Sequence, residues 1–479
     1  MNPPNSVLVV GGGPAGSVTA TLLAKEGLAV RLIESQRFPR YHIGESLTPS
    51  TRHVLQLAGV ADTLDQQGFQ VKRGGVFHWG DDTWTIDWSK LFGDHMRTWQ
   101  VDRASFDELL LNNARDNGVK VEQQVAAKAV TFGADGRPTA VRCQPSSGAE
   151  FTIDDFDYLI DASGRTGLLS AQHFRNRTQH QSFRNVAVWS YWRNARLLPD
   201  SPEGAVNVVS SPRGWYWVIP LSDGRTSIGL VTHKDAFARD RRAHTTLDDL
   251  YQAVVADSDT VTGLLTDATC VAPARVETDY SYVADSFCGP GHMLIGDAAC
   301  FLDPLLSTGI HLALYGGMVG AACLAAMHRG DVPEDTALRF FEASYRRAYT
   351  RMLALVTSMY ECYQGKDDFF WTADRLIHDT PPAPGGPAPA GGVPARPDSA
   401  SFGEIIAGLS DLREASDTST RVQTSRLTAE ARRAEAGQPA PQNLPAFDAL
   451  RATPTDDGAL MGWQVVTTPR LGIERVVPE

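Results

Sequence analysis

The chain has 479 residues, 42% hydrophobic and 21% charged, which allows more than one packed domain and excludes disorder over the whole length. Its 56 acidic side chains outnumber 44 basic ones, and the formal net charge of -12 argues against nonspecific binding to nucleic acid or an anionic membrane. The six cysteines include no Cys-x-x-Cys pair, so we expect no metal site, no disulfide framework, and a reducing compartment such as the cytoplasm.

The N-terminal residues have neither the basic segment nor the apolar core of a signal peptide. The longest apolar stretch, residues 312–327, is sixteen residues long, whereas roughly 20 are needed to span a bilayer. We therefore expect no transmembrane helix and no membrane partner.

Residues 6–10 and 29–33 are short apolar runs, and residues 15–26 between them have apolar side chains at helical spacing. This pattern predicts a strand, a turn, a helix and a second strand. The turn reads Gly-x-Gly-x-x-Gly, and an acidic residue, Glu34, ends the second strand. This arrangement predicts a dinucleotide site, for NAD or for FAD.

A steric requirement explains why each of these positions in the turn is glycine. Gly11 permits the tight turn, Gly13 lets backbone N–H groups approach a pyrophosphate, and Gly16 allows close helix packing. The helix N-terminus adds partial positive charge for the anion. Glu34 would accept hydrogen bonds from the adenosine ribose and repel a 2'-phosphate.

Further along, the tetrad 105–108 has the form of a capping box and predicts the start of a helix that ends at Gly118, with residues 119–121 extended after it. Short alternating runs between 126 and 161 predict a small antiparallel sheet that precedes a strand at 158–161. Four more strands predict one curved antiparallel sheet: 186–192, 206–210, 215–220 and 227–231.

A carboxylate follows another predicted strand. Residues 293–295 are apolar, Gly296-Asp297-Ala298-Ala299 comes next, and a long helix of small residues follows. In α/β folds ligands bind at the carboxyl ends of strands. Asp297 can accept a hydrogen bond from a ribityl hydroxyl, which NAD lacks, so this feature favours FAD.

Four motifs in this order resemble those of the FAD-dependent aromatic hydroxylases and their relatives. They are the glycine-rich turn at 11–16, Asp102-Arg103 leading to Phe106-Asp107, Asp161-Ala162-Ser163-Gly164, and the segment 296–299. The resemblance extends from about residue 5 to about residue 325. It implies an α/β fold with a Rossmann-like FAD-binding domain of the hydroxylase type, an inserted antiparallel sheet domain and a C-terminal helical region. By this resemblance FAD is held by Gly11, Gly13, Ala15, Gly16, Glu34, Ser46, Arg103 and Asp297.

The expected domain organisation has six parts. The segment 381–400 holds seven prolines and four glycines and predicts a mobile linker, and helices are expected at 402–412 and 425–436. The parts are the first portion of the FAD-binding domain (1–180), the antiparallel sheet on the substrate side (181–284), the closing portion of the FAD-binding domain (285–330), a helical extension (331–380), the linker (381–400) and a C-terminal helical segment (401–479).

Residues 215–220 read Trp-Tyr-Trp-Val-Ile-Pro and resemble the Trp-x-Trp-x-Ile-Pro mark of flavin-dependent halogenases. A buried strand with two indoles on one face would have the same pattern. The resemblance implies that Trp215, Trp217 and Pro220 separate the flavin from the organic substrate, so that a small oxidised halogen species must pass between the two.

Lys72 stands where this family has its essential lysine. The chain has seven lysines among its 44 basic residues, and an ammonium can lose its proton when desolvated, whereas a guanidinium cannot. The loop 44–49 resembles the family's strap over the flavin ring and offers a path toward Lys72. Any single lysine can also be a solvated surface residue.

Ser307-Thr308-Gly309-Ile310 precedes a helix, and Ser307 and Thr308 are good capping residues. The resemblance implies that the N–H groups of Thr308, Gly309 and Ile310 bind chloride, although an ordinary capped helix would look the same. Tryptophan halogenases have a glutamate where this chain has Leu306. The chain therefore resembles the branch that acts on phenols and pyrroles.

Together these features predict an FAD-dependent halogenase of natural-product biosynthesis. Reduced FAD from a flavin reductase, oxygen and chloride would give hypochlorous acid, and Lys72 would relay it, as a chloramine or by a hydrogen bond, to an aromatic small molecule. That substrate could be tethered to an acyl or peptidyl carrier protein, for which Arg346, Arg347 and Arg351 are candidate contacts, although a solvated helix face is the more ordinary interpretation. The alternatives are an FAD-dependent aromatic hydroxylase, a flavin-dependent isoprenoid alkene reductase and a noncatalytic flavin-holding protein.

Overall fold

The computed structural model describes residues 4–361, 399–415 and 462–476. Its first layer is a six-stranded sheet of order β18-β19-β11-β1-β2-β7, in which all neighbours pair in parallel except β18 and β19. The strands are β1 (Ser6–Val10), β2 (Ala29–Glu34), β7 (Lys120–Gln123), β11 (Tyr158–Asp161), β18 (Cys288–Gly289) and β19 (His292–Leu294). Continuous apolar runs such as β1 are expected in a parallel sheet because both of its faces are covered.

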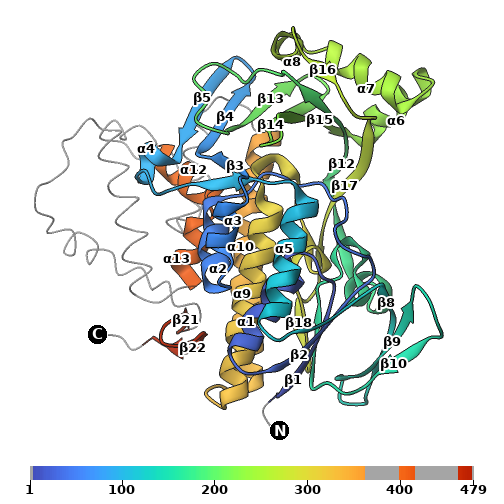
Figure 1. The fold of residues 1–479 in the computed structure, drawn as a ribbon, viewed down its shortest axis with the longest axis vertical. Helices are drawn as coiled ribbons and strands as arrows, with labels where there is room; N and C mark the ends of the chain where they lie inside the picture. The colour runs from blue at the N-terminus through green and yellow to red at the C-terminus, as the bar shows by residue number, and fades with distance from the viewer. Residues whose placement is uncertain (1–3, 362–398, 416–461, 477–479) are drawn as a thin grey trace, which may run out of the picture.

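Long helices pack together beside this sheet (Figure 1). They are α1 (Pro14–Lys25), α5 (Arg103–Asp116), α9 (Thr308–Arg329) and α10 (Glu334–Glu361), and α1 contacts both α5 and α9. By length and hydropathy α9 could cross a membrane, but 94% of its most apolar window is buried inside the protein. The apolar character of α9 is therefore that of a core helix.

The start of α5 differs from the sequence prediction. The helix begins at Arg103, and Asp102 is the N-cap, whose carboxylate accepts the backbone N–H of Ser105 at 3.1 Å. The predicted capping box at 105–108 was wrong, since a stronger cap three residues earlier satisfies the free N–H groups.

A second, nine-stranded sheet has the order β20-β17-β12-β15-β14-β13-β4-β5, with β16 also paired to β12. Its strands are β4 (Gly74–Trp79), β5 (Asp82–Asp87), β12 (Arg177–Arg193), β13 (Val206–Ser211), β14 (Gly214–Pro220), β15 (Arg225–His233), β16 (Thr269–Cys270), β17 (Arg275–Ala284) and β20 (Cys300–Phe301). The four predicted strands all belong to it. The strands β4 and β5 come from the segment that the sequence analysis assigned to the FAD-binding part.

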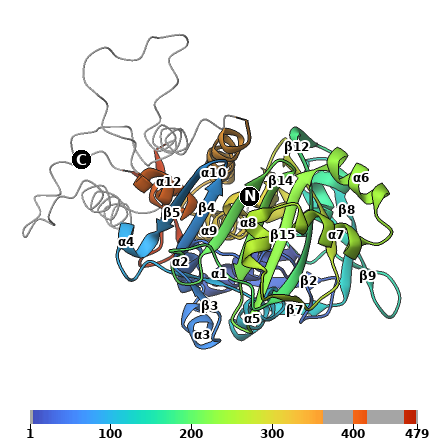
Figure 2. The ribbon, with the colours of Figure 1, turned by 90° about the horizontal axis from the view of Figure 1, so that it is seen from above.

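Three helices that the sequence analysis did not predict cover one face of the large sheet (Figure 2). They are α6 (Lys234–Ala243), α7 (Leu247–Ala256) and α8 (Asp259–Leu264). Leu250, Tyr251 and Val254 of α7 pack on Tyr216 and Val218 of β14 and form a second, smaller core. The opposite face of β14 is therefore turned toward the six-stranded layer.

Smaller elements complete the described chain. A three-stranded antiparallel sheet contains β8 (Val125–Phe132), β9 (Pro138–Pro145) and β10 (Phe151–Ile153), and a pair contains β3 (Gln70–Lys72) and β6 (Thr98–Gln100). The remaining helices are α2 (Pro49–Leu57), α3 (Ala61–Gln66), α4 (Trp88–Phe92), α12 (Ser399–Ile406) and α13 (Leu409–Ala415). A hairpin of β21 (Trp463–Val466) and β22 (Gly472–Arg475) ends the described chain. The predicted helix at 425–436 and the linker up to residue 398 lie outside the described residues.

Candidate active site

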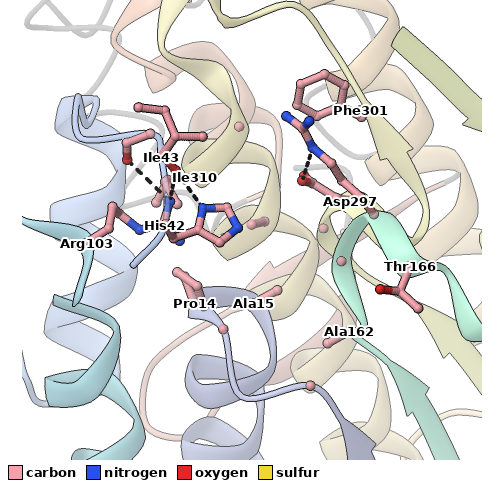
Figure 3. Close-up of a pocket in the computed structure, with 18 of the residues that line it drawn as sticks. Pro14, Ala15, His42, Ile43, Arg103, Ala162, Thr166, Asp297, Phe301 and Ile310 are labelled. Carbon is pink, nitrogen blue, oxygen red and sulfur yellow. Dashed lines mark hydrogen bonds and ion pairs between the residues drawn. The ribbon is translucent and has the colours of Figure 1, made fainter. Parts of the chain in front are cut away.

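A cavity of about 640 Å³ lies between the two layers. The glycine-rich turn, the loop from Arg40 to Ser46 and the aromatic face of β14 all line it. In Figure 3, Arg103 lies on one side of this cavity and Asp297 on the other, with Ala15 at the start of α1 between them. Its volume lies in the range of cofactor and ligand pockets.

The glycine-rich turn has the close contacts that the motif predicts. Gly11 has a φ of +109°, and a Cβ on it would lie 2.2 Å from the Ala162 carbonyl oxygen. A Cβ on Gly16 would lie 1.9 Å from the Gly11 oxygen. Gly13 is different, because the nearest heavy atom to its Cβ position is Nη2 of Arg40 at 3.6 Å. Gly13 therefore borders the cavity, where a pyrophosphate needs close access to the backbone.

Glu34 is buried at the end of β2 and lines the cavity. Its carboxylate accepts the backbone N–H groups of Gly12 and Gln36, both at 2.7 Å. These bonds hold the acid beside the turn, where it can also accept a ribose hydroxyl. The turn and the acid together fit the adenosine diphosphate portion of FAD.

Arg103 is buried, and its guanidinium forms a two-point ion pair with Asp107 at 2.8 and 3.0 Å. A further N–H group donates to the Ile43 carbonyl at 2.8 Å, so Arg103 ties the loop that precedes Ser46 to α5. Opposite it, Asp297 lies 3.8 Å from Nε of Arg165 and lines the cavity. Both predicted residues therefore line the cavity, on opposite sides of it.

Lys72 is buried at the end of β3, with 2% of its surface exposed. Its Nζ donates to Ser46 Oγ and to the Leu47 carbonyl, both at 2.7 Å, and lies 5.0 Å from the centre of the Trp88 ring. Desolvation lowers the pKa of this amine to about 7. Ser46 lines the cavity whereas Lys72 does not, so Ser46 connects the cavity to the buried amine.

Indole side chains form one wall of the cavity. Trp215 and Trp217 both line it, with ring centroids 6.2 Å apart, and Trp189 lies 6.2 Å from Trp217. Nε1 of Trp215 donates to the Tyr360 hydroxyl at 2.5 Å, which anchors this wall to α10. Pro220 ends β14 and does not line the cavity; its neighbour Ile219 does. The sequence analysis did not identify Trp189.

A chain of hydrogen bonds behind this wall was also missed. Nε1 of Trp189 donates to the Tyr41 hydroxyl at 2.9 Å, the Tyr41 and Tyr191 hydroxyls are 3.0 Å apart, and Tyr191 donates to Glu45 at 2.7 Å. Burial raises the pKa of the Glu45 carboxyl. The sequence signal was the alternation of Trp189 and Tyr191 on one face of a predicted strand, together with the position of Glu45 beside Ser46.

The first turn of α9 lines the same cavity through Thr308, Gly309 and Ile310. Ser307 occupies the N-cap position with a φ of +59°, but its side chain makes no capping hydrogen bond, so the predicted capping role was wrong. Its backbone is left-handed, whereas an N-cap side chain reaches the free N–H groups from an extended backbone. The Thr308 hydroxyl is buried and has no hydrogen-bond partner among the described residues, which is consistent with space for an additional ligand.

The family model described as "Tryptophan halogenase" matches residues 6–98 and 94–384, more than half of the chain. The chain belongs to this family. It is a flavin-dependent halogenase, and its cofactor and halide are FAD and chloride.

Several relatives of the halogenase are named for different substrates. It is 41% identical to a tryptophan 2-halogenase of Chondromyces crocatus over 78% of this chain and 71% of the relative, and 35% identical to the sulochrin halogenase gedL of Aspergillus terreus over 75% and 70%. Among solved structures it resembles the myxobacterial chondrochloren halogenase CndH, with a TM-score of 0.71, 30% identity and coverage of 89% and 96%.

Two of the three candidate arginines in α10, Arg346 and Arg351, are held by contacts with other parts of the halogenase. Arg351 is buried and forms an ion pair with Asp411 of α13, and Arg346 pairs with Glu342 and donates to the Ala284 carbonyl. The interpretation of these residues as a solvated helix face was wrong for Arg351, because a C-terminal segment distant in sequence packs over it.

Proposed function

We propose that the halogenase makes hypochlorous acid in the cavity and that Lys72 relays the oxidised chlorine to an electron-rich ring, phenolic or pyrrolic, either free or held on a carrier protein. The observation that carries this proposal is the buried Lys72 amine, whose hydrogen-bond partner Ser46 lines the cavity. A flavin reductase supplies the reduced cofactor. Five free cysteines among the described residues support a reducing compartment, which we propose to be the cytoplasm.

In this proposal the residues of the cavity have separate roles. When bound in reduced form, FAD supplies the electrons that activate oxygen. The free N–H groups of Thr308, Gly309 and Ile310, at the positive end of α9, hold chloride without a formal charge. The indoles of Trp215 and Trp217 keep the organic substrate away from the flavin. Glu34 would accept a hydrogen bond from the adenosine ribose.

Two routes for Lys72 are compatible with its surroundings. A neutral amine attacks the chlorine of hypochlorous acid, forms an N–Cl bond and releases water; the arene then takes the chlorine and loses a proton, which regenerates the amine. Alternatively the ammonium donates a hydrogen bond to the oxygen of hypochlorous acid, and the arene attacks the chlorine directly. The lowered pKa of Lys72 supports the first route.

A substitution of Lys72 tests the relay. With reduced FAD, oxygen and chloride, we expect Lys72→Ala to bind FAD and consume oxygen like the wild type but to lose arene chlorination by about 100-fold or more. Lys90→Ala is the matched control, because the Lys90 side chain is 82% exposed. Undiminished chlorination by Lys72→Ala would contradict the relay. A hydroxylated product without chlorine would favour a hydroxylase, and oxygen-free turnover an alkene reductase.

The substrate class needs a separate experiment. Leu306, buried and uncharged, stands where tryptophan halogenases carry a glutamate, which supports a ring that is activated by its own hydroxyl or nitrogen. We expect chlorination of phenols or pyrroles, free or as carrier-protein thioesters, at least tenfold faster than that of tryptophan. Preferential chlorination of tryptophan would overturn this assignment.

A further inference from the structure

Outside the cavity, a second cluster of buried polar side chains joins α2, α9 and α13. The Ser50 hydroxyl lies 2.8 Å from Nδ1 of His311, and Nε2 of His311 lies 2.8 Å from Asp411. Arg351 of α10 forms an ion pair with the other oxygen of Asp411. None of these four side chains is more than 4% exposed. The order of serine, histidine and aspartate is that of a nucleophilic triad, so the cluster requires an explanation.

A nucleophilic role does not fit the surroundings of Ser50. Gly408, in the turn between α12 and α13, has a φ of +72°, and a Cβ on it would lie 2.3 Å from Ser50 Oγ and 2.6 Å from Nδ1 of His311. The Ser50 N–H also donates to the Ala407 carbonyl at 2.9 Å. The C-terminal turn therefore covers the hydroxyl, and neither Ser50 nor His311 lines the cavity.

The cluster instead contacts two parts of the proposed active site. His311 directly follows Thr308–Ile310 in the first turn of α9. Ser50 lies in the first turn of α2, and its hydroxyl is 2.9 Å from that of Thr48. The residue before Thr48 is Leu47, whose carbonyl accepts the hydrogen bond from Lys72. One cluster thus connects the proposed halide turn (Thr308–Ile310), the proposed strap over the flavin (residues 44–49) and the C-terminal segment (399–415).

The charges in the cluster determine which atoms donate. Arg351, together with a hydrogen bond from His311, holds the pKa of the Asp411 carboxyl below its ordinary value. A carboxylate can only accept, so Nε2 of His311 carries the proton in this contact. Nδ1 can then accept from the Ser50 hydroxyl, and the Ser50 oxygen can accept from Thr48. Every contact in the chain is satisfied in this one direction.

We propose that Asp411 and His311 are positioning residues, which dock the segment 399–415 against the end of the strap. They thereby hold the Leu47 carbonyl and the halide turn in a fixed position relative to Lys72. This inference rests on the proposed relay through Lys72. The consequence is that oxygen consumption is coupled to chlorination. When the strap is held, hypochlorous acid reaches the arene, and when the strap is loose, the acid escapes.

Ser50→Ala and Asp411→Asn test this inference. Ser50→Ala removes the contact between His311 and the strap but leaves the ion pair of Asp411 with Arg351, so the C-terminal segment stays docked. Asp411→Asn keeps the shape of the side chain and removes its charge. Asp335→Asn is the matched control, since its side chain is 65% exposed and pairs with Arg339 on the surface.

Two measurements are made on each full-length variant with FAD bound: the ratio of chlorinated product to oxygen consumed, and the amide hydrogen exchange of residues 44–57. We expect both test variants to lower the ratio at least threefold and to speed exchange in 44–57 at least fivefold, with little change in β1. The control should match the wild type. A wild-type ratio or wild-type exchange in Ser50→Ala would overturn the inference.

The failure of this inference can be distinguished from failure of the relay. If Lys72→Ala chlorinates normally, the relay is wrong, whatever the cluster does. The exchange measurement does not depend on Lys72, so it still decides whether the cluster holds the strap. If Asp411→Asn does not fold, Ser50→Ala, which removes a single oxygen, decides the outcome.

Discussion

At the scale of single residues, the proposed relay depends on a buried lysine that has no carboxylate partner in the described part of the chain. The Lys72 amine is held by two oxygens at 2.7 Å and by the face of Trp88, and burial lowers its pKa to about 7. An arginine could not lose its proton in this place. The proposed relay therefore needs both the identity and the burial of residue 72.

The pKa of Lys72 predicts the pH dependence of chlorine transfer. Only the neutral amine has a lone pair, and it predominates above a pH of about 7, so the rate should rise through an apparent pKa near 7 and level off above it. The measurement is the pH profile of arene chlorination in single turnovers. A rate that falls over the same pH range would instead indicate that the ammonium acts, by donating a hydrogen bond to hypochlorous acid. Lys72→Arg should be inactive at every pH.

The same shift predicts a pH dependence of stability. Between pH 7 and the ordinary pKa of 10.5, the unfolded lysine binds a proton and the folded one does not, so stability rises with pH. Relative to Lys72→Met, the wild-type free energy of unfolding should rise by about 1.4 kcal/mol per pH unit in this window. Urea unfolding of both proteins at three pH values measures the slope. If the free energies of unfolding of the two proteins change with pH in the same way, the amine is not desolvated.

Thr308 gives a residue-scale prediction for chloride. Its buried hydroxyl lacks a partner among the described residues and adjoins the proposed halide turn. We expect Thr308→Val, which keeps the shape, to raise the KM for chloride at least threefold while protein stability stays equal or increases by about 1 kcal/mol. Chloride titration and thermal unfolding measure the two effects. Loss of stability with an unchanged KM would contradict this role.

At the scale of elements, the strap and the central strands of the large sheet are connected by Glu45 and Tyr191. The pKa of the buried Glu45 carboxyl is raised by desolvation, and Tyr191 donates the hydrogen bond that offsets part of this cost. The strap is thus held from two sides, by this bond and by Arg103 through Ile43.

Tyr191→Phe should loosen the strap. It leaves the Glu45 carboxyl without this donor, and we expect a loss of about 1–3 kcal/mol in stability and at least threefold weaker FAD binding. Tyr216→Phe is the control, since the Tyr216 hydroxyl donates to the Val254 carbonyl on the opposite face of the same sheet. The control should lose about 1 kcal/mol and bind FAD normally. Equal FAD affinities in both variants would show that Tyr191 does not act through the strap.

At the scale of the whole molecule, C-terminal segments return to the first helices of the chain. Besides α13, the hairpin of β21 and β22 docks beside α1 and α9, where the Glu26 carboxylate accepts the Leu471 N–H at 3.0 Å and pairs with Arg329 at 2.9 Å (Figure 1). These contacts join the two ends of the described chain without touching the cavity.

Glu26→Ala should therefore separate stability from catalysis. We expect it to lower the free energy of unfolding by about 1 kcal/mol and to expose the hairpin to proteases, with FAD binding unchanged. Asp331→Asn removes the other, more exposed ion-pair partner of Arg329 and should have little effect. Weaker FAD binding in Glu26→Ala would contradict this separation.

Parts of both sheets and much of the geometry of the glycine-rich turn could be predicted from the sequence. The turn at Gly11 to Gly16, Glu34 and the strands at 206–210 and 215–220 depend on local backbone sterics and on alternation, which are present within a few residues. The start of α5 and the helices α6 to α8 were not predicted correctly. The local sequence there allows more than one helix start, and tertiary packing determines which of them is used.

By itself, then, the sequence determined the family and the cofactor, because short motifs with fixed spacing indicate them without a fold. It also predicted which residues would bind the cofactor. Only the tertiary structure decided that Lys72 is desolvated, that Trp189 completes the wall, and that Ser50, His311 and Asp411 meet. The last contacts join residues 261 and 100 positions apart. Desolvation and such long-range hydrogen bonds exist only after the layers have packed together.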